Sequence, residues 1–227
     1  QNEIPLVAHI ADPEFCWDAA RVPEWAVAAG YFYGDDSFVR QETLYAEMED
    51  VLTRFPRLRV VLAHFYFKSA DLDGLDAWLA IHPNISLDIV AGTEMYFNFA
   101  LKPDDWRAFF IKHQDRIIFG TDNMNHDDPV DLENARVINN LELAFLASDG
   151  DIPAWDKQAR GISLPVDVQE KILRTNFLRL VHGEPRPLDR PAACRYLEAR
   201  LRNHALALKP EERTVISDVL EYLIDLG

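Results

Sequence analysis

Two histidines and one aspartate stand where short apolar runs of the chain finish. They are His9, His64 and Asp122, and Asp88 lies inside a further run of the same kind. Imidazole and carboxylate groups are usual ligands of Zn²⁺ and related divalent ions. A single histidine at the end of a strand is more often a structural polar residue at a loop junction. Two histidines and an aspartate at successive strand ends favour a shared metal site, provided that the strands end at one edge.

The apolar runs are continuous rather than alternating, which is typical of strands that are covered on both faces. They span residues 4–10, 58–65, 85–91 and 116–120. Apolar residues at helical spacing predict helices over 41–55 and 71–81, and a third that begins at Pro103. This alternating order predicts a parallel sheet with right-handed crossovers. In such a sheet the side chains at the carboxyl ends of the strands converge on one edge.

Beyond the fourth strand the pattern predicts only helices, over residues 134–146, 165–181, 192–206 and 210–226. A proline-rich stretch, 184–191, separates the last two helices from the others. We therefore predict an α/β domain over residues 1–183 and a helical C-terminal extension over residues 184–227.

The composition excludes some classes of partner. With 38 acidic and 23 basic side chains the net charge is −15, which disfavours binding to nucleic acid. No apolar run approaches the ~18 residues of a membrane span, so no membrane association is expected. Cys16 and Cys194 form no CxxC motif, and the N-terminus lacks the features of a signal peptide, so we predict a cytoplasmic protein with reduced thiols. The chain begins without methionine just before a strand, so we expect a further segment upstream.

Four segments of the chain resemble one family of enzymes. Residues 55–64 (FPRLRVVLAH) and 115–122 (DRIIFGTD) look like the sixth- and eighth-strand segments of the amidohydrolase-related group, which includes metal-dependent hydrolases and decarboxylases related to aminocarboxymuconate-semialdehyde decarboxylase. Residues 6–9 (LVAH) are similar to its fifth-strand segment, and residues 171–180 (KILRTNFLRL) to the helix that closes such barrels. The resemblance implies a partial (β/α)8 TIM barrel, with strands equivalent to the fifth to the eighth.

The resemblance also implies roles for the three polar residues. His9 matches a metal ligand on the fifth strand, and Asp122 matches a metal ligand that also handles the proton of the attacking water. His64 matches either a ligand of a second metal or a polarising, proton-transferring group. A divalent metal is therefore expected, with Zn²⁺ as the expected ion. The family carries a His-x-His pair on its first strand, and this sequence has none. We expect the missing ligands to come from an N-terminal barrel half or from self-association.

Several residues beside these positions are candidates for contact with a small-molecule substrate. They are Asp12, Trp17, Tyr66, Glu94 and Asn123. Each also has an ordinary structural alternative, as a loop residue or as a core aromatic. Asp88 is expected to be a structural or supporting carboxylate.

Three functions remain open at this point. The first is hydrolysis of a C–N or C–O bond in a small organic substrate through a metal-activated water. The second is a metal-dependent, non-oxidative decarboxylation by the same kind of site. The third is a non-catalytic half barrel that associates with another chain, because four strands leave two open edges.

Overall fold

The computed structural model describes residues 5–90, 92, 94–122, 129–155, 157–181, 183, 188–203 and 208–225. It divides into two compact units, Gln1–Gly183 and Glu184–Gly227. None of the helices in these described ranges combines the length and the apolar character that crossing a membrane requires.

The centre of the first unit is a parallel sheet of four short strands. Its strands are β1 (Leu6–Ala8), β2 (Val60–Leu62), β3 (Ile85–Asp88) and β4 (Ile117–Ile118). They lie side by side in chain order, and every neighbouring pair is parallel. The predicted parallel order is therefore confirmed, although each strand is shorter than predicted. Closure of these strands into a (β/α)8 barrel stays a prediction.

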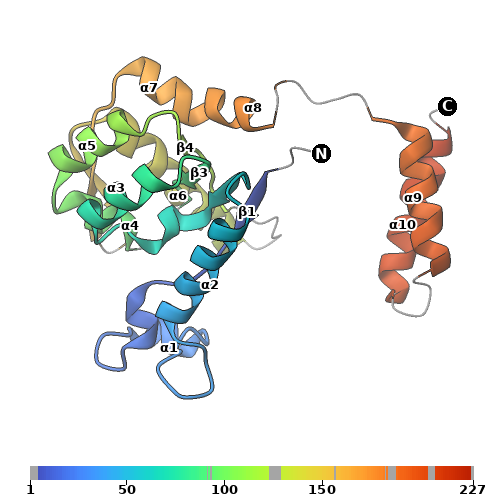
Figure 1. Ribbon diagram of the computed structural model, residues 1–227, viewed down its shortest axis with the longest axis horizontal. Coiled ribbons are helices and arrows are strands. Elements are labelled where there is room, and N and C mark those ends of the chain that lie inside the picture. Colours follow the sequence, from blue (N-terminus) through green and yellow to red (C-terminus); the bar gives the residue numbers. More distant parts are fainter. Residues whose placement is uncertain are drawn as a thin grey trace. The chain divides into compact units, whose positions relative to one another are not determined.

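The strands are connected by α2 (Gln41–Arg54), α3 (Leu72–Ile81) and α5 (Pro103–Lys112), as the spacing predicts. A further short helix, α4 (Met95–Ala100), was not predicted. The side chain of Asp71 caps α3 by accepting a hydrogen bond from the backbone N–H of Gly74 at 3.0 Å. Proline stands at the first turn of α5, where its missing N–H costs nothing. Helices α3, α4 and α5 lie together beside the sheet (Figure 1).

The core is built around a cluster of aromatic rings. Its innermost members are at most 2% exposed: Phe65, Phe99, Trp106, Phe110 and Phe145. The ring centroid of Phe99 lies 4.6 Å from that of Trp106 and 5.1 Å from that of Phe65. Interlocked aromatic rings of this kind resist displacement, since each contributes a large buried area. Phe65 belongs to the turn after β2, so the core anchors that turn.

The chain after β4 contains more than the predicted helices. Helix α6 (Pro129–Ala147) precedes an antiparallel hairpin, β5 (Asp151–Ala154) and β6 (Lys157–Arg160), which the sequence analysis missed. The helix predicted over 165–181 consists of α7 (Val166–Glu170), a π-helical turn η3 (Lys171–Thr175) and α8 (Asn176–Leu180).

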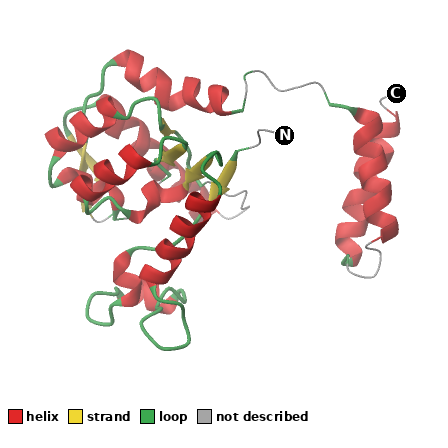
Figure 2. Ribbon diagram, in the orientation of Figure 1, coloured by secondary structure: helices red, strands yellow, loops and turns green. Residues whose placement is uncertain are grey.

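The second unit is a pair of helices, α9 (Arg190–Asn203) and α10 (Pro210–Asp225), which pack against each other. Figure 2 shows that helices predominate throughout the described chain and that the strands are few and short.

One prediction about the sheet was wrong. The first strand was expected to be covered on both faces, but the side chains of Leu6 and Val7 are 46% and 66% exposed. The strand β1 lies at one edge of the sheet, paired only with β2 among the described strands, and no described element covers Leu6 and Val7 as the core covers the residues of β4 at the other edge. The segment between β1 and α2, with the short helices η1 (Glu14–Trp17) and α1 (Glu24–Ala28), projects away from the sheet (Figure 1).

Candidate active site at the carboxyl edge of the sheet

The sheet brings His9, His64 and Asp122 together at the carboxyl ends of its strands. His9 directly follows β1, His64 is the second residue after β2, and Asp122 is the fourth residue after β4. The imidazole centroids of His9 and His64 are 4.9 Å apart, in an edge-to-face arrangement. The Nε2 atom of His64 lies 4.0 Å from the Oδ2 atom of Asp122. The three polar groups therefore form one contiguous cluster.

An unusual turn aims the side chain of His64. Four successive residues, His64 to Phe67, have positive φ angles between 50° and 58°. Such left-handed backbone is uncommon for residues other than glycine, and it costs energy at each step. The carboxylate of Asp88, at the end of β3, accepts hydrogen bonds from the backbone N–H groups of His64 at 2.8 Å and Val90 at 3.3 Å. Asp88 and the buried ring of Phe65 thus hold the turn in place.

Burial raises the pKa of Asp88 to about 6, and the two N–H donors oppose this rise. Asp88 is 6% exposed, so its carboxyl group is held inside the protein and is not presented to a ligand. This is the supporting position that the sequence analysis expected for Asp88.

His9 is paired with a carboxylate on its own loop. Its Nε2 atom lies 3.5 Å from the Oδ1 atom of Asp12, and this contact raises the pKa of His9. The same contact, together with a 2.8 Å hydrogen bond from the hydroxyl of Tyr33, lowers the pKa of Asp12. The side chain of Gln41 also holds the loop, since its Nε2 atom donates to the carbonyl oxygen of Asp12. His9 is therefore oriented by an Asp12–Tyr33 hydrogen-bonded pair.

His64 has the opposite electrostatic character. Burial, and then the neighbouring His9, lower the pKa of His64 and so favour its neutral imidazole. The ring stacks on Phe67 with centroids 5.1 Å apart. Its Nδ1 atom is buried without a hydrogen-bond partner in the described part of the chain. Neutral imidazole is the form that binds a metal or donates a hydrogen bond through one nitrogen.

The donor types of this cluster suit a divalent metal, and they amount to part of a ligand set. His9, His64 and Asp122 provide two imidazoles and one carboxylate. Among the residues that the structure describes, however, no group of three or more His, Cys, Asp and Glu side chains is arranged to hold an ion. The residues present fit a metal as contributors, and a complete site needs ligands in addition to them.

The other candidate residues lie at different distances from the cluster. Asp12 belongs to it through His9. Trp17 contacts the cluster through Tyr33, with ring centroids 4.9 Å apart. The Nε1 atom of Trp17 donates a hydrogen bond to the backbone carbonyl of Val39. Trp17 therefore supports the loop that carries Asp12.

Tyr66 and Glu94 are placed differently. Tyr66 follows His64 in the same turn, but its ring packs between Tyr45 and Trp78, at centroid distances of 4.9 and 5.0 Å. Glu94 precedes α4, and burial raises its pKa. One of its carboxylate oxygens is buried without a hydrogen-bond partner in the described chain. Asn123 lies outside the described residues.

Sequence reasoning missed Tyr33 and Gln41, which fix the Asp12 loop. Both lie more than twenty positions from Asp12, in a segment without a recognisable motif. The side chain of Cys16, in η1, is 2% exposed. Burial raises its thiol pKa to about 12, which disfavours the thiolate form.

Comparison with known proteins identifies the first unit. A family model described as Amidohydrolase matches residues 2–182. No curated protein and no solved structure matches the chain.

Proposed function

Because the chain belongs to the amidohydrolase family, whose activities are in general metal-dependent hydrolysis and related reactions, we propose that it hydrolyses a C–N or C–O bond in a small organic substrate. The observation that carries the proposal is the convergence of His9, His64 and Asp122 at one edge of a parallel sheet.

In this proposal His9 and Asp122 hold a divalent metal, Zn²⁺ by preference, with His64 beside them. The bound ion supplies Lewis acidity, which lowers the pKa of a water molecule to around 7. The Asp12–Tyr33 pair keeps the His9 ring oriented, as supporting carboxylates do for metal-binding histidines.

Asp122 and His64 have separate tasks in the reaction. The carboxylate of Asp122 is 67% exposed, so it is free to accept the proton of the attacking water and return it to the leaving group. His64 is buried and favours the neutral state, so an imidazole N–H is available to stabilise negative charge that develops on the substrate oxygen. The rigid turn keeps that donor in a fixed direction, which limits the reorganisation needed during the reaction.

The remaining metal ligands are proposed to come from a further segment of the protein or from a second chain. The exposed apolar edge strand β1 supports this, because an uncovered strand edge is a template for pairing with another strand. A non-catalytic half barrel that only associates through this edge is the competing proposal.

Metal analysis of the purified protein tests the site. We expect a stoichiometric divalent ion in the protein assembled with its partner segment, and its loss in both His9→Ala and Asp122→Asn. Asp104→Asn, an exposed acid at the start of α5, is the matched control and should retain the ion. Unchanged metal content in both site variants would refute the assignment. Screening amides, lactones and small carboxylates with CO₂ release monitored separates hydrolysis from decarboxylation.

Sedimentation analysis tests the association. Val7→Lys on β1 should weaken assembly, whereas Leu101→Lys should leave it unchanged, since Leu101 is 79% exposed after α4 and away from the strand edge. Equal assembly of both variants would exclude β1 as the interface.

A further inference from the structure

A cavity of about 370 Å³ lies between α2, α3 and the turn after β2. None of His9, His64 and Asp122 lines it, so it is separate from the polar cluster at the sheet edge. Its volume is within the range of small-molecule sites in proteins.

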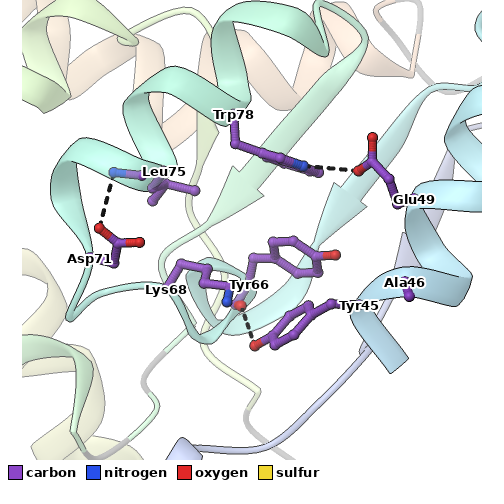
Figure 3. Close-up of a pocket in the computed structure, with 9 residues that line it drawn as sticks. Tyr45, Ala46, Glu49, Tyr66, Lys68, Asp71, Leu75 and Trp78 are labelled. Carbon is purple, nitrogen blue, oxygen red and sulfur yellow. Dashed lines mark hydrogen bonds between the residues drawn. The ribbon is translucent and has the colours of Figure 1, made fainter. Parts of the chain in front are cut away.

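Aromatic rings make up the walls of this cavity. Tyr45 comes from α2, Tyr66 from the turn η2 (Ala63–Phe67) and Trp78 from α3. Figure 3 shows the ring of Tyr66 between those of Tyr45 and Trp78. The hydroxyl of Tyr45 donates to the backbone carbonyl of Tyr66 at 3.2 Å, which fixes the Tyr45 ring. These walls favour a ligand with a flat apolar body.

The cavity is lined by one cation among the described residues, Lys68. The amine of Lys68 lies 3.8 Å from the ring centroid of Tyr45, a cation–π contact. Within the described parts of the chain no ion pair forms on Lys68, although the side chain is half-buried. Burial lowers the pKa of Lys68, and the negative charges of Asp71, Glu14 and Glu42 oppose this shift. An anion in direct contact with this amine would stabilise its ammonium form further.

The two acidic residues of the cavity are already engaged. Glu49 accepts a 3.0 Å hydrogen bond from the Nε1 atom of Trp78, and its other oxygen lies 3.1 Å from the Nε2 atom of His82. Asp71 caps α3. Lys68 is the cation that lines the cavity, and its ammonium group has three donors, so it has hydrogen-bonding capacity for an anion.

We propose that this cavity binds a small aryl carboxylate, with the carboxylate on Lys68 and the ring against Trp78. The site does not rest on the hydrolytic function, because it shares no side chain with the proposed metal ligands. It does share the turn η2 with His64, so a bound ligand would contact the segment that aims this imidazole.

Phenylacetate, phenylacetamide and acetate test the proposal on the full chain by isothermal titration calorimetry at low salt. Phenylacetate should bind saturably, and the neutral amide and the ringless anion should each bind at least about tenfold more weakly. No saturable binding of phenylacetate would overturn the proposal. Equal affinity for acid and amide, or for phenylacetate and acetate, would overturn it too. These comparisons need no variant, so they hold whatever a substitution does to folding.

Three variants then locate the site. Lys68→Met should reduce phenylacetate affinity at least about tenfold, and Lys68→Arg should retain it within a few-fold. Lys102→Met, which removes an exposed lysine before α5, is the matched control and should bind like the wild type. Wild-type affinity in folded Lys68→Met would place the ligand elsewhere and overturn the assignment.

Discussion

Removing the carboxylate of Asp88 should destabilise the first unit strongly, although Asp88 contacts no proposed ligand. Asp88→Ala leaves the N–H groups of His64 and Val90 without their acceptor. An unsatisfied buried donor costs about 1–3 kcal/mol. Taking the 2.8 Å bond near the upper part of that range and the 3.3 Å bond near the lower part gives a loss of about 3 kcal/mol. Asp88→Asn retains an oxygen acceptor and should cost less than the alanine variant.

Urea unfolding followed by tryptophan fluorescence measures this loss. All five tryptophans lie within the first unit, so their emission reports on that unit and not on α9 and α10. A loss of about 3 kcal/mol shifts the midpoint by about 1 M or more, for slopes typical of urea. A loss below about 1 kcal/mol for Asp88→Ala would show that Asp88 does not hold the turn, and the account of how His64 is aimed would then be wrong.

Three further perturbations test the packing around the sheet. Asp76→Asn should lower the free energy of unfolding by roughly 0.5–1 kcal/mol at pH 7. Hydrogen bonds from Lys112 and then His113 lower the pKa of Asp76 from 3.8, so in matched urea titrations this difference should persist above pH 3.8 and shrink as the pH falls below it. A difference that does not depend on pH would contradict the assignment. Asn176→Ala should lower the free energy of unfolding by about 2 kcal/mol in the same assay, because the buried side-chain N–H₂ group of Asn176 donates to two backbone carbonyls at β4 and just before it. An unchanged free energy of unfolding would refute that role. Phe99→Ala should cost about 3–5 kcal/mol, because the fully buried ring packs among the other core aromatics, and Phe99→Leu should cost clearly less.

The strand order could be predicted from sequence because the physical signal is local. Runs such as Val60–Leu62 contain only residues that favour buried strands, and all three are buried. The same reasoning gave a buried β1, where it was wrong, because apolar content does not reveal whether anything covers a strand. Leu6 and Val7 have the composition of a core strand and the exposure of an edge.

Two other elements lacked a usable signal. Helix α4 was missed because Met95, Tyr96 and Phe99 are all fully buried, so its short sequence shows no polar face and no helical period. In the β5–β6 hairpin, β5 alternates between exposed and buried residues, but each strand has only four residues and Pro153 lies within the first. A proline in so short a run argues against a strand.

For the site, too, the sequence predicts the features that depend on local patterns and misses those that depend on distant segments. That His9, His64 and Asp122 lie at one edge follows from parallel strands, and spacing along the chain suffices to predict it. How they are held does not follow, because the supports come from distant segments. Tyr33 reaches Asp12 from across a loop, and the carboxylate of Asp88 on one strand fixes the backbone after another.

The turn after β2 shows why such detail escapes sequence analysis. Left-handed backbone is expected at glycine, yet here it runs through one histidine, two phenylalanines and one tyrosine. The strain is offset by contacts that only the fold creates: a buried carboxylate on the backbone, Phe65 in the core and Tyr66 against Trp78. The side chains of this turn contribute to the core, to the polar cluster and to the aromatic cavity, so its conformation is determined by several parts of the first unit. A strained turn that is held from several sides keeps His64 in one direction, which is the property that a group stabilising developing charge requires.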